Sequence, residues 1–289
     1  MISRERAPIH WTLVQWPRRA HLADNRRVPH EIFYGVNQRL LGFLLLFCLL
    51  IAAELGYRFG RRSAAPEGQD SSELGVLLGG VLGLLALLLG FTFSMSMSRY
   101  ERRKDLVIEE ANAIGTADLR ALTLPGPLAK DADRLLVRYV EEQVAYHDAW
   151  ASPAEQESRN AEIKRLQARL WNGARSAAAR NRDPLTALYV ASLNEVIDLN
   201  ARRLYAKQDH VPEPVLVVLA SVTFLSILLV GYGFGVAGRR HAVPLLVACV
   251  ILSVVVVLIM DLDRPDRGRI VISPKVLSEL KTELETSAP

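Results

Sequence analysis

The chain contains 289 residues, of which 50% are hydrophobic and 23% are charged, and its formal net charge at pH 7 is +4. The hydrophobic residues collect in four uncharged runs, at residues 40–53, 74–97, 215–237 and 242–260. A helix needs roughly 20 residues to cross the apolar core of a membrane, and three of these runs have about that length. This distribution excludes a wholly soluble protein, a disordered protein and a disulfide scaffold.

The first two runs predict a transmembrane helix pair over residues 37–97. The first helix is expected to extend to Phe59, because Glu54 and Arg58 lie four residues apart and can pair near the membrane edge. Residues 1–36 are polar and rich in Arg, and they are too long for the basic start of a signal peptide. They are therefore predicted to be a retained basic segment in the cytoplasm.

The last two runs predict a second transmembrane pair over residues 215–260, followed by a cytoplasmic segment over residues 261–289 that is loosely ordered after about Ser273. A cytoplasmic N-terminus puts fifteen basic residues near span ends on the cytoplasmic side. The opposite side then holds five, which are Arg58, Arg61, Arg62, Arg239 and Arg240. The positive-inside rule thus favours four spans with both termini in the cytoplasm. No pattern of base-stacking aromatic residues accompanies the basic residues, so nucleic acid is not an expected partner.

Residues 98–214 predict a cytoplasmic helical domain. Apolar residues recur at helical spacing there, for example at Ile163, Leu166 and Leu170. Ser152 and Asp183 each precede a proline and read as residues that cap the start of a helix. Neither Gly nor Pro interrupts residues 91–114, so the second span should continue into this domain as one helix. The predicted fold is therefore all-α.

No enzyme signature is present. The six histidines show no metal-ligand spacing with one another or with Cys or Glu, and there is no phosphate-binding loop. Gly233, Gly235 and Gly238 match the spacing of a dinucleotide fingerprint, but they follow an apolar helix rather than a strand. We interpret them as small residues for close packing at a helix end and expect no catalytic residue.

The second span carries two patterns. Gly75, Gly79 and Gly83 recur every four residues, which is typical of closely packed membrane helices. Hydroxyls then alternate with bulky residues at the end of the span. The alternation spreads the hydroxyls over two helical stripes, which are Thr92/Ser96 and Ser94/Ser98. Such hydroxyls can bind carbonyl groups of their own helix, so they indicate either contacts between helices or a lining exposed to water.

Carboxylates gather at two places outside the spans. Asp261, Asp263 and Asp266 follow the fourth span, where they could coordinate a hard cation such as Ca²⁺ or pair with neighbouring arginines. Glu109 and Glu110 lie beyond the second span, and they suggest ion pairs between or along helices, with a vestibule for ions as the alternative.

Three segments resemble the bacterial bestrophin-like membrane family. They are GFTFSMSMSRYERRKDLVIEEANAIGTADLR at residues 90–120, SLNEVIDLNARRL at 192–204 and DLDRPDRG at 261–268. The resemblance extends from about Leu40 to Ile272. It implies a protein of the bacterial inner membrane and, more distantly, similarity to bestrophins, which are pentameric anion channels with four spans and a cytoplasmic helical domain.

The resemblance also implies roles for residues. Bestrophins have a Gly-Phe pair in the second span and a neck of three bulky residues four apart, and here these neck positions are Gly83, Leu87 and Phe91. Gly83 departs from that pattern. Animal members bind Ca²⁺ at an acidic turn that Asp261, Asp263 and Asp266 resemble, although Arg264 and the lack of a Phe after Pro265 depart from it.

We therefore expect a homo-oligomeric ion channel with a hydrophobic neck at Leu87 and Phe91. Thr92, Ser94 and Ser98 are expected to line the path of small ions. The alternative is a membrane-anchored helical scaffold or sensor that does not conduct. Oligomeric symmetry separates the two, because this kind of channel needs a ring of copies around an axis.

Overall fold

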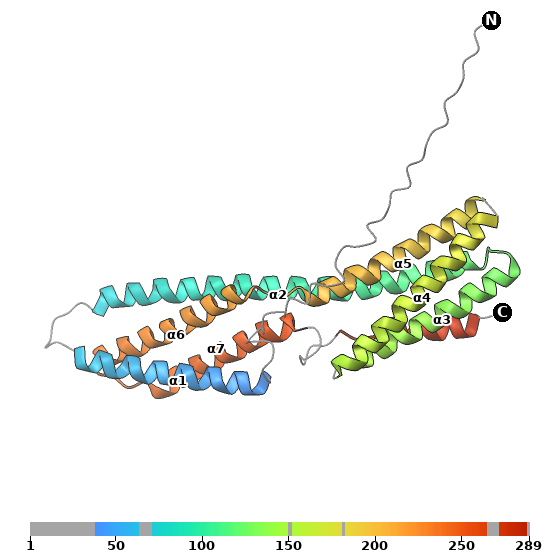
Figure 1. The fold of residues 1–289 in the computed structure, drawn as a ribbon. Helices are drawn as coiled ribbons and strands as arrows, with labels where there is room; N and C mark the ends of the chain where they lie inside the picture. Colours follow the sequence, from blue (N-terminus) through green and yellow to red (C-terminus); the bar gives the residue numbers. More distant parts are fainter. Residues whose placement is uncertain (1–37, 64–70, 150–151, 181–182, 265–271, 288–289) are drawn as a thin grey trace, which may run out of the picture. The chain divides into compact units, whose positions relative to one another are not determined.

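The computed structural model describes residues 38–63, 71–149, 152–180, 183–264 and 272–287. Within these ranges the chain is helical and contains no strand, which confirms the predicted all-α class (Figure 1). The basic segment 1–36 and Asp266 lie outside the described residues. The helices are α1 (Gln38–Ser63), α2 (Ser71–Ala121), α3 (Gly126–Asp148), α4 (Pro153–Arg180), α5 (Pro184–Gln208), α6 (Glu213–Val236), α7 (Ala242–Asp263) and α8 (Lys275–Ser287).

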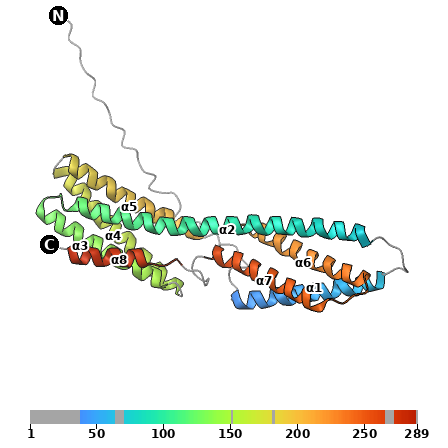
Figure 2. The same cartoon turned by 180° about the vertical axis from the view of Figure 1, so that it is seen from behind.

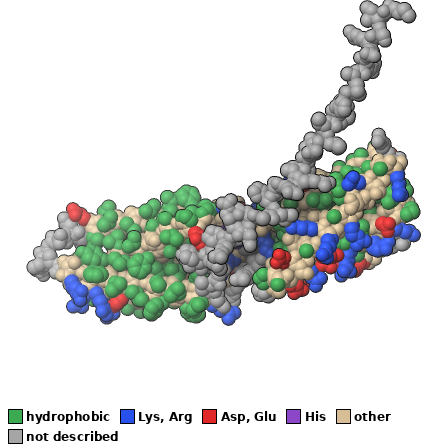
Figure 3. Space-filling view, in the orientation of Figure 1, with side chains coloured by type: hydrophobic (Ala, Val, Ile, Leu, Met, Phe, Trp, Pro, Cys, Tyr) green, Lys and Arg blue, Asp and Glu red, His purple; other side chains and the backbone are tan. Residues whose placement is uncertain are grey.

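Four stretches of helix are long and apolar enough to cross a membrane: α1, the first part of α2, α6 and α7. The helix α1 packs along α6, and α7 contacts both α1 and α2. Hydrophobic side chains cover the visible faces of these helices, whereas charged side chains crowd the helical domain (Figure 3). Because lipid is as apolar as the side chains, these exposed faces suit a bilayer.

Close packing between α1 and α6 depends on four glycines, Gly56 and Gly60 on α1 and Gly231 and Gly235 on α6. A Cβ atom on any of them would overlap a backbone carbonyl oxygen of the facing helix. Gly235 was one of the residues interpreted as packing at a helix end, and it does pack in this way. The other three were not singled out from the sequence.

The glycines of the second span behave differently. A Cβ atom on Gly75, Gly79 or Gly83 would meet nothing within 4 Å in the chain. Within one copy they therefore mediate no close helix packing. Their packing role stays a prediction, and it concerns contacts between copies.

The predicted continuity of the second span is found, since α2 is one helix from Ser71 to Ala121 (Figure 2). Its second half joins α3, α4, α5 and α8 to form the helical domain. Asp183 caps α5 by accepting a hydrogen bond of 2.8 Å from the amide of Thr186. The predicted stripe Ile163, Leu166 and Leu170 is buried.

The C-terminal segment corrects one expectation, because residues 275–287 form helix α8 rather than a loosely ordered tail. Leu277, Leu280 and Leu284 are buried at helical spacing and belong to the core of the helical domain. The helix packs against α2 and α3. A short amphipathic segment of this kind is ordered by the surface it covers, which a local pattern does not reveal.

Candidate functional site

One side of α2 is left uncovered by the rest of the chain. Gly83, Leu87, Phe91, Ser94 and Ser98 recur at spacings of three and four residues, so they occupy about one third of the helix circumference. All five are exposed, and the exposed fraction is 53% for Leu87 and 64% for Phe91. The structure thus brings the two neck candidates and two of the three predicted lining residues onto one stripe.

Thr92 does not belong to that stripe. It is 3% exposed and faces the side of α2 that carries the fully buried Ser96. Its hydroxyl donates to the carbonyl oxygen of Leu88 at 2.7 Å. This bond within the helix satisfies the hydroxyl, so the expectation that Thr92 lines a path is corrected.

The uncovered stripe continues beyond the apolar run into the helical domain. Its exposed members there are Arg102, Asp105, Glu109, Asn112, Thr116 and Leu119. Arg102 and Glu109 form an ion pair of 3.7 Å along this face. The side chains on the stripe therefore change from bulky and apolar, through hydroxyls, to charged and polar along a single helix.

The opposite side of α2 anchors the end of α7. The guanidinium of Arg103 donates to the carbonyl oxygens of Leu262 at 2.6 Å and Asp263 at 3.1 Å. A cation at a helix C-terminus binds the last carbonyl groups and complements the helix dipole. Arg103 is 4% exposed, so it ties the fourth span to α2 from within the protein.

The acidic residues at the C-terminal end of α7 belong mainly to this anchor. The Asp263 carboxylate accepts a hydrogen bond of 2.9 Å from the amide of Val211, which lies between α5 and α6. Asp261 and Asp263 are 4% and 1% exposed. Within the described ranges, no group of three or more His, Cys, Asp or Glu residues could hold a metal ion. The third predicted ligand, Asp266, lies outside those ranges.

A buried polar network surrounds Glu110 in the helical domain. One carboxylate oxygen pairs with Nε of Arg203 at 2.7 Å, and the other accepts from Tyr139, Gln143 and Asn200 at 2.8 to 3.2 Å. Burial, and then the negative charge of Glu110, raise the pKa of Tyr139 well above its ordinary value. The prediction of an ion pair between helices holds for Glu110, whereas its partners could not be read from spacing along one helix.

The chain is similar to proteins of known fold. It matches the family described as a Bestrophin-like domain over residues 40–277. Two variants of a bacterial bestrophin homologue from Klebsiella pneumoniae are similar to it, with TM-scores of 0.62 and 0.60 at 15% and 17% identity. These matches cover 86% of this chain and 96% and 97% of those chains. A structure of a membrane protein variant gives a TM-score of 0.59 at 16% identity and covers 84% of this chain and 95% of that chain.

These structural matches show the fold, since their identities are low. A search of curated proteins finds no match. The family match covers most of the chain, including all of the uncovered α2 stripe and the α7 anchor, and it confirms the resemblance seen in the sequence. With four apolar helices of sufficient length, the chain is an integral membrane protein that belongs to the Bestrophin-like family.

Proposed function

We propose that the protein is a homo-oligomeric ion channel in which the uncovered stripe of α2 lines the ion path. The observation that carries this proposal is the continuity of the stripe. Every member of the stripe from Gly83 to Leu119 is exposed, and the buried residues of α2 over this range lie mainly on the opposite side. A ring of copies around an axis would enclose these stripes and give each of them the same environment.

The neck is assigned to Leu87 and Phe91. Both side chains project from the stripe, and bulky apolar residues in a narrow pore hinder ions by excluding water. Gly83 lies one helical turn before Leu87 and has no side chain, so the ion path is wider at Gly83 than at the neck. Ser94 and Ser98 follow Phe91 and offer hydroxyls to ions that have passed the neck.

Exposed leucines in the helical domain support self-association. Leu119 and Leu122 on α2 are 69% and 48% exposed, and Leu185 and Leu188 on α5 are 52% and 47% exposed. These residues lie outside the apolar spans, so water rather than lipid would meet them in a single copy. Clusters of exposed apolar side chains of this kind commonly mark protein interfaces. Five copies are the number that the family resemblance suggests.

The proposed location is the bacterial inner membrane, with both termini in the cytoplasm. The excess of basic residues near the span ends on the side of the helical domain supports this orientation. Cysteine accessibility on each side of the membrane tests it directly.

Salt-gradient flux in liposomes tests conduction. Phe91→Ala and Leu87→Ala should change the flux of the purified protein, because each alters the neck. Phe47→Ala is the matched control, since Phe47 is a 61% exposed phenylalanine on α1 and is expected to face lipid. Unchanged flux in Phe91→Ala would refute the neck assignment. If a verified oligomer gave no flux across a range of pH and Ca²⁺ concentration, the protein would instead be a non-conducting scaffold or sensor.

A further inference from the structure

The helical domain holds a cavity of about 330 Å³ between α3, α4 and α5. Sites for small molecules begin at about this volume and are lined mainly by apolar side chains. The apolar side chains that line this cavity are Leu124, Leu128, Ala132, Leu135 and Leu170. Gly173 on α4 also lines it, and a Cβ atom there would meet nothing within 4 Å. The cavity therefore has an apolar wall and unfilled space beside α4.

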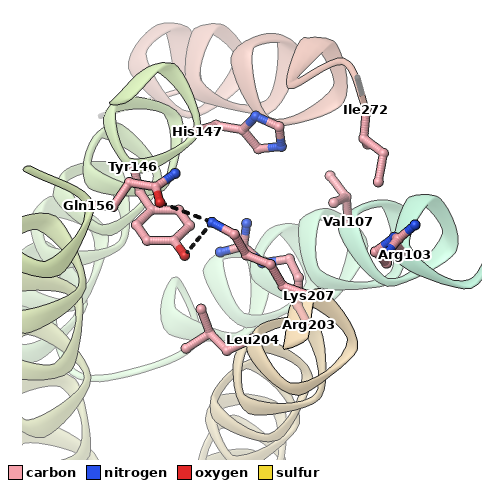
Figure 4. A pocket seen from close by; sticks show the side chains of 9 residues that line it. All are labelled: Arg103, Val107, Tyr146, His147, Gln156, Arg203, Leu204, Lys207 and Ile272. Carbon is pink, nitrogen blue, oxygen red and sulfur yellow. Dashed lines mark hydrogen bonds between the residues drawn. The ribbon is translucent and has the colours of Figure 1, made fainter. Parts of the chain in front are cut away.

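The pocket at Lys207 differs, because its polar groups already have partners. There Lys207 donates to the Tyr146 hydroxyl at 3.0 Å and to the amide oxygen of Gln156 at 3.1 Å (Figure 4). Arg203, which also lines that pocket, pairs with Glu110. The volume is about 50 Å³, which is enough for only a few water molecules. Of the two, the larger cavity is thus the one with room for an organic ligand.

Tyr189 on α5 is a buried polar residue in the wall of the larger cavity. The residue is only 2% exposed, and its hydroxyl makes no hydrogen bond with any residue that the structure describes. Buried polar groups normally have a partner, because leaving one unsatisfied costs free energy. A tyrosine hydroxyl keeps its proton at neutral pH, so Tyr189 offers a hydrogen-bond donor to a ligand.

The charged side chains that line the cavity leave one positive charge uncompensated. Asp131 and Arg134 form an ion pair of 2.7 Å and neutralise each other. Arg169 on α4 forms no ion pair with any described residue, and no acidic residue lies within four positions of it in the sequence. Asp118 acts on Tyr189 from outside the lining, but its pKa is raised, mainly by burial, so it opposes an anion less than an exposed carboxylate would.

We propose that this cavity binds a small organic acid with an apolar body. The apolar body would fill the space between the leucines and Gly173. The carboxylate would accept hydrogen bonds from Arg169, whose planar guanidinium suits a carboxylate, and from the Tyr189 hydroxyl. One positive charge and one hydroxyl suit a monocarboxylate better than a phosphate, which carries more charge and more acceptor oxygens. The proposal does not depend on whether the protein conducts ions.

The first arm of the test measures the role of charge by isothermal titration calorimetry with the purified full-length protein. The two probes are octanoate and octanol, which have the same chain but only octanoate has a negative charge. Octanoate is expected to bind the wild type roughly tenfold more tightly than octanol, and Arg169→Gln should lose this preference. Arg175→Gln is the matched control, because Arg175 is an exposed residue of α4 that does not line the cavity.

The second arm fills the cavity with a side chain. Gly173→Leu should abolish the binding of both probes without lowering the unfolding midpoint, since the space is open and leucine favours a helix more than glycine does. Ala161→Leu is the control, because Ala161 is exposed on α4 and lies outside the lining. Uptake of the probes by detergent is the same for all variants, so differences between variants report the site.

The proposal is overturned if the wild type binds neither probe, if Gly173→Leu folds and binds octanoate as tightly as the wild type, or if octanol and octanoate bind the wild type equally. Should Gly173→Leu fail to fold, Arg169→Gln decides the outcome, because an exposed side chain can be replaced with little effect on stability. In that case, unchanged octanoate affinity in Arg169→Gln would overturn the proposal.

Discussion

The α1–α6 contact and the first part of α2 carry the same sequence pattern and use it in opposite ways. Both have glycines four residues apart. At Gly56, Gly60, Gly231 and Gly235 the backbones of two helices touch, so no side chain fits. At Gly79 and its neighbours on α2 the space is open. The spacing of small residues therefore shows where a helix can be approached closely, but only the fold shows whether the same chain makes that approach.

The strongest test of this difference replaces one glycine at each place with alanine. Gly231→Ala should lower the free energy of unfolding by about 3 kcal/mol or more, because its Cβ overlaps the carbonyl oxygen of Ala53 and forces two helices apart. Gly79→Ala should not destabilise the protomer, and it gains up to about 1 kcal/mol from higher helix propensity. Thermal unfolding in detergent measures both. Equal midpoints for the two variants would contradict the distinction.

The two sides of α2 can be compared at adjacent carboxylates. Glu110→Gln should cost about 3 kcal/mol, since it leaves Arg203 buried without its ion pair. Glu109→Gln removes an exposed pair at 3.7 Å and should cost less than about 1 kcal/mol. Unfolding in denaturant gives both values. A similar small cost for both variants would mean that the Glu110 network does not hold the helical domain together.

A smaller effect is expected when the open space at Gly83 is filled. Gly83→Leu adds the third bulky residue of a bestrophin neck to the exposed stripe, where nothing in the chain obstructs it. The flux through liposomes should fall several-fold while the unfolding midpoint stays unchanged. An unchanged flux with an intact oligomer would show that Gly83 does not face the ion path.

The smallest effect concerns pH. Burial, and then the nearby charge of Asp133, raise the pKa of Asp118 above its ordinary value. The native state therefore favours the protonated acid, and the stability that this preference provides is present below the unfolded pKa and lost as pH rises through the folded pKa. Asp118→Asn should raise the unfolding midpoint at pH 7, with the gain fading below about pH 4. A gain that persists at low pH would have another cause.

Several features could be predicted because they depend on local patterns. The four apolar helices follow from the uncharged runs, and the start of α5 follows from Asp183 before Pro184. The continuation of the second span into the helical domain follows from the lack of Gly and Pro over residues 91–114. These features are set by residues close together in the chain, so one sequence is enough to show them.

The parts that sequence reasoning missed depend on contacts between distant residues. Glu110 meets its partners from α3 and α5 only after folding, and α8 needs the surface of α2 and α3 to become ordered. The side of α2 on which Thr92 lies was likewise ambiguous, because alternating hydroxyls fall on two stripes. The pocket at Lys207 is lined by residues of α2, α3, α4 and α5, and no sequence motif predicts it.

The length of α2 has a mechanical consequence. Its 51 residues form a rod of roughly 75 Å, and Phe91 and Leu119 are separated on it by roughly 42 Å. One uninterrupted α-helix joins these two positions, with no proline between them, and Gly115 lies inside the helix without breaking it. A rotation of α2 about its own axis in the helical domain would therefore turn the side chains of Leu87 and Phe91 through the same angle.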